Sequence, residues 1–133
     1  MSNPSLPNGQ FSWCELLTTD TEAAQQFYGT LFNWTLEPAP NAPPGIDYRI
    51  AQCDGKPVAG MMSIPDTNPG MPPHWGSYIT VEDVDKTVQQ ATALGATVCV
   101  PPQDIAEVGR FSVLQDPQGA VFGIISYLPS HCD

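Results

Sequence analysis

The first half of the sequence alternates short apolar runs with one helical pattern. Residues 11–18 (FSWCELLT) form a β-prone run. A capping-box pattern follows, in which Thr19 is the expected N-cap and Glu22 lies three residues later. Three strand-like segments, at residues 34–38, 47–52 and 57–63, come after the helix. Within the expected helix, apolar residues recur at i, i+3, i+4 and i+7, and this spacing predicts one buried face. These residues are Ala24, Phe27, Tyr28 and Leu31.

The second half repeats this pattern. A β-prone run at residues 76–81 precedes Asp83, the expected cap of a second helix, and Gly95 is placed to end that helix. The predicted apolar face of this helix contains Val84, Val88, Ala91 and Leu94. Three further strands are expected at residues 97–101, 110–115 and 121–127, and tight turns at residues 53–56 and 116–119 join the last two strands of each half.

An offset of 63 residues relates the two halves without gaps. It places Asp20 on Asp83, Leu31 on Leu94 and Gly60 on Gly123. The sequence therefore predicts an α+β fold within a single 1–133 domain, made of two βαβββ units. We expect the units at residues 8–66 and 72–130, joined by a Pro-rich linker.

Composition narrows the functional classes. The chain has 15 Pro and 11 Gly, and only 14% of its residues are charged, with a net charge of −10. That charge argues against binding to nucleic acid or to an anionic membrane surface, both of which need clustered basic residues. The first residues (MSNPSLPNGQF) do not read as a secretory signal, and no apolar run reaches the ~18 residues of a membrane span. Four cysteines lack zinc-site spacing, so we expect free thiols and a cytoplasmic protein.

Residues 11–34 (FSWCELLTTDTEAAQQFYGTLFNW) contain a "TxD" helix start, an "FY" pair and an "LF-W" exit. The segments YITVEDV at residues 78–84 and DPQG at residues 116–119 follow in the second half. These motifs resemble the vicinal oxygen chelate superfamily of glyoxalases, bleomycin-resistance proteins and extradiol dioxygenases. The resemblance implies strands that curl around a central cavity, a divalent metal held by His, Glu or Gln on the first and last strand of each half, and assembly as a homodimer.

The four positions that correspond to the metal ligands carry no ligating side chain. Counting seven residues back from Asp20 and Asp83, and forward from Asp116, identifies three of them as Trp13, Gly76 and Gly123. The fourth is Gly60, the repeat partner 63 residues before Gly123. We therefore expect no metal and no other cofactor. His74 lies two residues before one of these positions, where it is either a displaced ligand or a residue at the rim of the cavity.

Strand alternation predicts a mostly apolar cavity with a few polar groups. Glu15 is the candidate acid or base, and its alternative role is a structural carboxylate paired with Arg49, Arg110 or a backbone amide. Trp13 is either a stacking platform or a plug for the space of the metal, and Cys14 is expected to face the helix as a buried thiol. Thr80 adds a hydroxyl. The expected ligand-binding residues are Trp13, Glu15, Gly60, Met62, Gly76, Tyr78, Gly123 and Ile125.

Three functions remain open at this point. The first is a glyoxalase- or bleomycin-resistance-like protein without the family metal, which binds a small hydrophobic or aromatic molecule. The second is a glyoxalase-like lyase or a dioxygenase that has a non-standard or metal-free site using Glu15. The third is an interaction domain whose cavity Trp13 and Met62 have filled.

Overall fold

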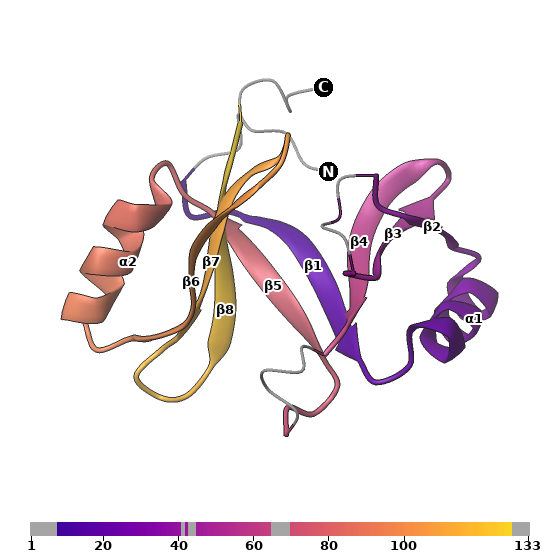
Figure 1. Ribbon diagram of the computed structural model, residues 1–133, viewed down its shortest axis with the longest axis horizontal. Helices are drawn as coiled ribbons and strands as arrows, with labels where there is room; N and C mark the ends of the chain where they lie inside the picture. The colour runs from indigo at the N-terminus through magenta and orange to yellow at the C-terminus, as the bar shows by residue number, and fades with distance from the viewer. Residues whose placement is uncertain (1–7, 41, 43–44, 65–69, 129–133) are drawn as a thin grey trace. The chain divides into compact units, whose positions relative to one another are not determined.

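The computed structural model describes residues 8–40, 42, 45–64 and 70–128 (Figure 1). Strands and helices follow one another in the order βαβββ, twice, as the sequence predicts. The elements are β1 (Phe11–Thr18), α1 (Thr21–Phe32), β2 (Thr35–Pro38), β3 (Tyr48–Cys53), β4 (Lys56–Ser63), β5 (His74–Thr80), α2 (Val84–Ala93), β6 (Thr97–Ile105), β7 (Gly109–Gln115) and β8 (Val121–Tyr127). The predicted Pro-rich linker lies partly outside the described residues.

Contacts divide the chain into two compact units. We call residues 14–76 the central unit, and residues 1–13 with 77–133 the terminal unit. The boundaries fall inside β1 and β5, so each of these strands contributes to both units. In the described part of the chain, neither helix is long and apolar enough to cross a membrane.

The central unit contains strands in the order β2-β3-β4-β1. β1 runs parallel to β4, and the other neighbouring pairs are antiparallel. Glu15 is the Cα partner of Gly60, and Ile50 lies opposite Gly60 on the other side. A tight hairpin joins β3 to β4 at Asp54 and Gly55, which both have positive φ angles of 52° and 79°. A two-residue loop of this kind was expected from the sequence.

The terminal unit repeats this arrangement with strands in the order β5-β8-β7-β6. Tyr78 on β5 is the parallel partner of Gly123 on β8, and Val113 on β7 lies opposite Gly123. Adding 63 to each number in the central unit gives these same pairs, because 15 + 63 = 78 and 60 + 63 = 123. The strand register therefore confirms the repeat and its offset.

Aspartates begin both helices. The Asp20 carboxylate accepts a hydrogen bond from the Ala23 amide at 3.0 Å, and Asp83 accepts one from the Lys86 amide at 3.1 Å. The cap of α1 is thus Asp20 and not Thr19, because Asp20 is the residue with extended backbone whose side chain reaches the first turn. α2 ends before Gly95, whose φ of 105° is the left-handed conformation expected there.

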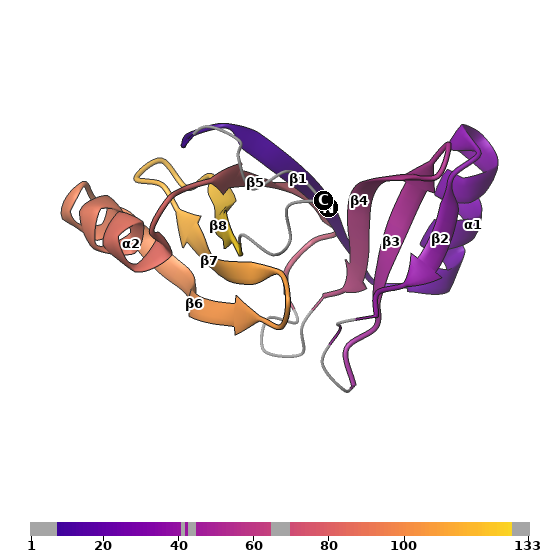
Figure 2. The ribbon, with the colours of Figure 1, turned by 90° about the horizontal axis from the view of Figure 1, so that it is seen from above.

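The two helices differ in how much apolar surface they bury. In the terminal unit, Val84 is 2% exposed and packs with Val81, Leu114 and Ile124, so α2 covers one face of β7 and β8. In the central unit, α1 lies against β2 (Figure 2), and Thr21 is its only buried residue. The predicted burial of Phe27 and Leu31 is therefore wrong, and so is that of Leu94. Periodicity identified the face that Phe27 and Leu31 share, but both residues are more than half exposed in the single chain.

Candidate functional site

The central unit holds four of the expected binding residues. Glu15 is 7% exposed on β1, beside Gly60 on β4. Met62 lies two residues beyond Gly60 and is half-buried, and Gly76 occupies the start of β5. Residues that face each other across parallel strands project from the same side of the sheet. Glu15 therefore leaves the sheet on the side that Gly60 would use if it had a side chain.

The space above Gly60 is filled by a residue that the sequence analysis did not single out. A Cβ added at Gly60 would fall on the hydroxyl end of Tyr48, a β3 residue. The glycine thus admits the tyrosine ring, where we expected room for a ligand. The only indication in the sequence was that Tyr48 has an aromatic counterpart, Phe111, at an offset of 63.

The terminal unit holds the other four expected residues. Trp13 is buried, with 7% of its surface exposed, and the Tyr78 ring lies where a Cβ of Gly123 would be. Tyr78 makes an edge-to-face contact with Phe111 at a centroid distance of 6.3 Å. Both rings pack against a cluster that contains Ile125. Tyr78 and Ile125 therefore pack together, as members of one apolar cluster.

The four positions expected for metal ligands do not fit a divalent ion. Trp13 offers an indole, and the tyrosine rings already occupy the space beside Gly60 and Gly123. Gly76 has more room, since its nearest neighbour is the Glu15 carbonyl oxygen, 3.9 Å from an added Cβ. Within residues 8–40, 42, 45–64 and 70–128, no group of three His, Cys, Asp or Glu residues lies close enough together to hold a metal ion.

His74 is the first residue of β5 and is half-buried. Its Nδ1 lies 2.9 Å from the carbonyl oxygen of Pro72. This local contact accounts for one ring nitrogen, so the imidazole is tied to the segment that enters the strand. Its predicted role as a displaced ligand or rim residue stays a prediction.

One buried polar group on the predicted lining has no hydrogen-bond partner in the part of the chain that the structure describes. Thr80 is 5% exposed, and among the described residues its hydroxyl makes no hydrogen bond. It lies on β5 two residues after Tyr78, opposite Ile125. A buried hydroxyl left unsatisfied costs about 1–3 kcal/mol, so a group that supplied the missing hydrogen bond would be bound favourably.

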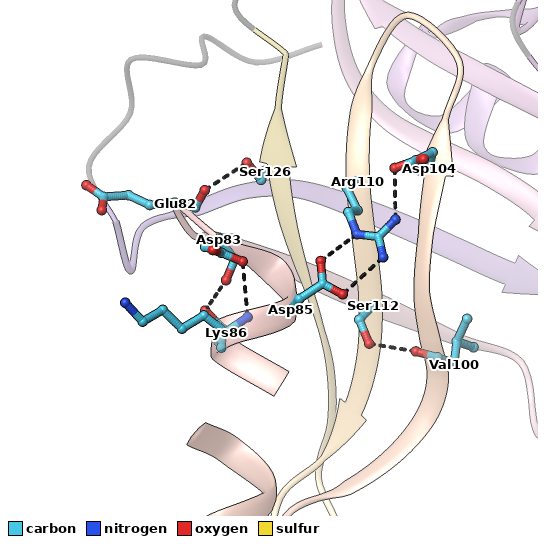
Figure 3. Close-up of polar contacts among 10 residues, drawn as sticks. Glu82, Asp83, Asp85, Lys86, Val100, Asp104, Arg110, Ser112 and Ser126 are labelled. Carbon is cyan, nitrogen blue, oxygen red and sulfur yellow. Dashed lines mark hydrogen bonds and ion pairs between the residues drawn. The ribbon is translucent and has the colours of Figure 1, made fainter. Parts of the chain in front are cut away.

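The arginines considered as partners of Glu15 form ion pairs with aspartates. Arg110 donates two hydrogen bonds to Asp85 at the start of α2, at 2.8 and 3.0 Å, and one to Asp104 on β6 at 3.0 Å (Figure 3). These bonds lower the pKa of the Asp85 carboxyl and raise that of the guanidinium. Arg49 pairs with Asp47 at 3.0 Å.

The Asp47 contact fastens α1 to β3. The Arg49 guanidinium and, secondarily, the Thr21 hydroxyl donate to Asp47 and lower the pKa of its carboxyl. Arg49 also donates to Gln25 on α1. In both units an arginine on the third strand thus ties the first turns of the helix to the sheet.

A shallow apolar groove lies on the helix side of the central unit. Its volume is about 440 Å³. Cys14 lines it and is exposed, so the expectation of a helix-facing thiol is confirmed while the expected burial is wrong. The other lining residues are Tyr28, Phe32, Trp34, Val58, Ala59 and Trp75.

The chain has two βαβββ units, and in each unit the first and last strands pair in parallel. This arrangement defines the class of protein that the sequence motifs indicated. The sequence matches the profile of the Glyoxalase/Bleomycin resistance protein/Dioxygenase superfamily over residues 10–124. The chain belongs to that superfamily, and the resemblance stated from the sequence is confirmed.

Relatives and solved structures agree with this membership. CFP32 of Mycobacterium tuberculosis, which is named as a glyoxylase, is 40% identical over 117 residues, covering 87% of this chain and 45% of CFP32. The anthracycline biosynthesis protein DnrV of Streptomyces peucetius is 30% identical over 128 residues, covering 87% of this chain and 46% of DnrV. The methylmalonyl-CoA epimerase of Streptomyces coelicolor, in complex with 2-nitronate-propionyl-CoA, has the same fold, with a TM-score of 0.63, 14% identity and coverage of 90% and 97%.

The chain spans about half the length of the curated relatives that it matches. In those proteins the matched region is accompanied by a further stretch that is at least as long as this chain.

Proposed function

We propose that this protein binds a small hydrophobic or aromatic molecule without a metal ion, using the predicted cavity face of its strands. The observation that carries this proposal is the buried hydroxyl of Thr80, which has no partner among the described residues. It lies on the strand face expected to line the cavity, beside Tyr78 and Ile125. A ligand with a hydrogen-bonding group and an apolar body would satisfy the hydroxyl and cover apolar side chains.

Glu15 supports the same proposal from the central unit. Glu15 is 7% exposed and lies next to Gly60, over which the Tyr48 ring is placed. A buried carboxylate favours ligands that donate hydrogen bonds or carry positive charge. The expected ligand-binding residues Trp13, Glu15, Gly60, Met62, Gly76, Tyr78, Gly123 and Ile125 belong to this proposal. So do assembly as a homodimer and a cytoplasmic location, with which the free thiols of Cys14, Cys53 and Cys99 are compatible.

Thermal-shift screening followed by isothermal titration tests the binding proposal. The panel contains planar aromatic compounds, both neutral and cationic. We expect a ligand that stabilises the wild type and that binds Thr80→Val and Glu15→Gln about 5- to 150-fold more weakly, because a lost hydrogen bond to a buried or charged group costs about 1–3 kcal/mol. Leu94→Gln, on the exposed end of α2, is the matched control and should bind normally. Unchanged affinity in both site variants would exclude this face as the binding site.

The burial of Glu15 also favours a second candidate function. In this case the protein is a metal-free enzyme that uses the Glu15 side chain as acid or base. Glyoxalase-like lyase and dioxygenase assays on metal-depleted protein test it. Activity that survives chelation and is lost in Glu15→Gln would favour the enzyme. Equal turnover by Glu15→Gln and wild type would exclude this role of Glu15.

A further inference from the structure

The central unit carries a group of aromatic rings in mutual contact. Tyr28 lies at its centre, with ring centroids 5.0 Å from Phe27 and 5.4 Å from Trp75. The Trp75 indole N–H also donates to the Tyr28 hydroxyl at 3.2 Å. The rings of Phe32 and Trp34 are tilted against one another, with centroids 5.3 Å apart. We call the following residues the α1 aromatic surface: Phe27, Tyr28, Leu31, Phe32, Trp34 and Trp75.

Much of this surface faces water in the single chain. Phe27, Leu31 and Phe32 are each more than half exposed, and Trp75 is 41% exposed. Large contiguous apolar patches are rare on proteins that act as monomers, and they mark surfaces that become covered. The groove of about 440 Å³ is lined in part by the same surface, through Tyr28, Phe32, Trp34 and Trp75.

The internal repeat provides a comparison within the molecule. If these rings were needed to pack a helix on its sheet, α2 would carry them too, yet α2 packs well without them. Position 27 is aromatic in α1, whereas its equivalent in α2 is an exposed glutamine. The counterparts at an offset of 63 residues are Gln90 for Phe27, Gly95 for Phe32, Thr97 for Trp34 and Ser12 for Trp75. The aromatic residues are therefore an addition specific to the central unit.

Charge indicates what kind of molecule covers the surface. Residues 23–36 contain no Asp, Glu, Lys, Arg or His, although the chain carries a net charge of −10. A basic partner would be drawn to the acidic surface elsewhere, since this segment offers it no opposite charge. Two copies of the chain repel one another, and they approach most easily where charge is absent.

We infer that the α1 aromatic surface is the surface on which a second copy of this chain docks. This rests on the homodimer proposed above and assigns its interface. In a two-fold dimer each copy offers the same patch, so an apolar, uncharged surface is complementary to itself. A fully exposed aromatic side chain offers roughly 150–250 Å², and these rings are about half exposed, so together they supply a part of the ~800 Å² that each partner buries in a stable complex.

Sedimentation velocity on the full chain tests the inference over a wide range of concentration. The test variant is Phe27→Gln/Leu31→Gln, in which position 27 receives the residue found at its counterpart in α2. Leu94→Gln is the matched control, because Leu94 is the repeat counterpart of Leu31 and is 74% exposed. We expect a dimeric wild type, a rise of about tenfold or more in the dimer dissociation constant of the α1 variant, and no change for Leu94→Gln.

A second measurement uses the wild type alone. Trp34 and Trp75 lie in the surface, so quenching of tryptophan fluorescence by acrylamide should increase when the protein is diluted into its monomeric range. Circular dichroism confirms that each variant is folded.

Each remaining outcome has a definite meaning. A dimeric wild type with an equally dimeric α1 variant would overturn the assigned surface and leave the homodimer standing. A wild type that is monomeric at every concentration would overturn both. If a small aromatic compound stabilises monomeric wild type and Leu94→Gln but not the α1 variant, the surface is a ligand site and the inference is wrong. Ligand binding lost only in Thr80→Val and Glu15→Gln reports on the proposed function separately.

Discussion

Two glycines at equivalent positions make room for tyrosine rings that come from different strands. Tyr48 on β3 reaches over Gly60, whereas Tyr78 on β5 reaches over Gly123. In the central unit, the residue equivalent to Tyr78 is Glu15. One face of the central sheet therefore carries the carboxyl group of Glu15 and the phenol of Tyr48. The terminal unit has two aromatic rings, Tyr78 and Phe111, at the equivalent positions.

This packing predicts the effect of a single methyl group. Gly60→Ala should lower the free energy of unfolding by about 1–3 kcal/mol, because the new Cβ falls on the Tyr48 side chain and forces it to move. Urea denaturation provides the measurement. Gly76→Ala is the control and should change stability little, since its Cβ makes only an ordinary contact at 3.9 Å.

A second substitution identifies the cause. Tyr48→Ala should remove most of the additional cost of Gly60→Ala in a double-mutant cycle. If Gly60→Ala is as mild as Gly76→Ala, the ring over Gly60 is not held in place as described.

Thr80 allows a prediction about stability in the absence of ligand. Thr80→Val should leave the free energy of unfolding unchanged or raise it by up to about 1 kcal/mol, since it removes a buried hydroxyl for which the described residues provide no hydrogen-bond partner. Ser112→Ala is the contrast, because the Ser112 hydroxyl donates to the Val100 carbonyl at 2.6 Å (Figure 3). That variant should lose about 1 kcal/mol. A destabilised Thr80→Val would mean that the hydroxyl is satisfied in solution.

At the scale of elements, both helices are fastened at their first turns by an arginine from the third strand of their unit. The pKa of Asp85 and of Asp47 is lowered by these contacts, so each carboxylate stabilises the fold at pH values above its ordinary pKa. This stabilisation is lost as the pH falls below about 4 and the unfolded chain takes up protons first.

Removing one arginine should therefore flatten the acid limb of the stability profile. We expect the thermal midpoint of Arg110→Gln to fall less than that of wild type between pH 5 and the acid range, because Asp85 then titrates alike in the folded and unfolded states. Circular dichroism melts across this range provide the measurement, and Lys56→Gln, on the β3–β4 hairpin, is a control that keeps both arginine contacts. Parallel profiles for wild type and Arg110→Gln would contradict this account.

The helices should also differ in how often they open. α2 is anchored in a buried cluster, whereas α1 leaves its apolar residues exposed in the single chain. We predict that the amides of α1 exchange with deuterium faster than those of α2 in dilute protein, and that dimer formation reduces the difference. Equal protection of both helices at low concentration would show that α1 is better packed than described here.

For the whole molecule, net charge and assembly should be linked through salt. Two copies that each carry −10 repel one another, and added salt screens that repulsion while leaving apolar contact intact. The dimer dissociation constant should therefore fall severalfold as sodium chloride is raised from low to physiological concentration. Sedimentation velocity measures it. A dimer that weakens with salt would indicate an interface made by opposite charges.

The fold was largely predictable because its determinants are local. Asp83 and Gly95 mark the ends of α2, and the pattern over residues 121–127 reproduces β8. The contacts between distant segments were harder to predict from the sequence. Periodicity groups Phe27 with Leu31 on one face but does not say what covers that face. The place of Tyr48 was missed because its ring arrives from a neighbouring strand.

The different origins of the two rings have a consequence for the evolution of the gene. If the halves arose by duplication, the tyrosine ring over each glycine was inherited or acquired separately in its own half. Substitution at Gly60 is then constrained by Tyr48, and substitution at Gly123 by Tyr78. Correlated substitutions should therefore occur between positions in neighbouring segments of the first half, and between positions in distant segments of the second half. A method that superimposes the two halves and pools their substitution patterns would average these couplings away, although both halves have the same fold.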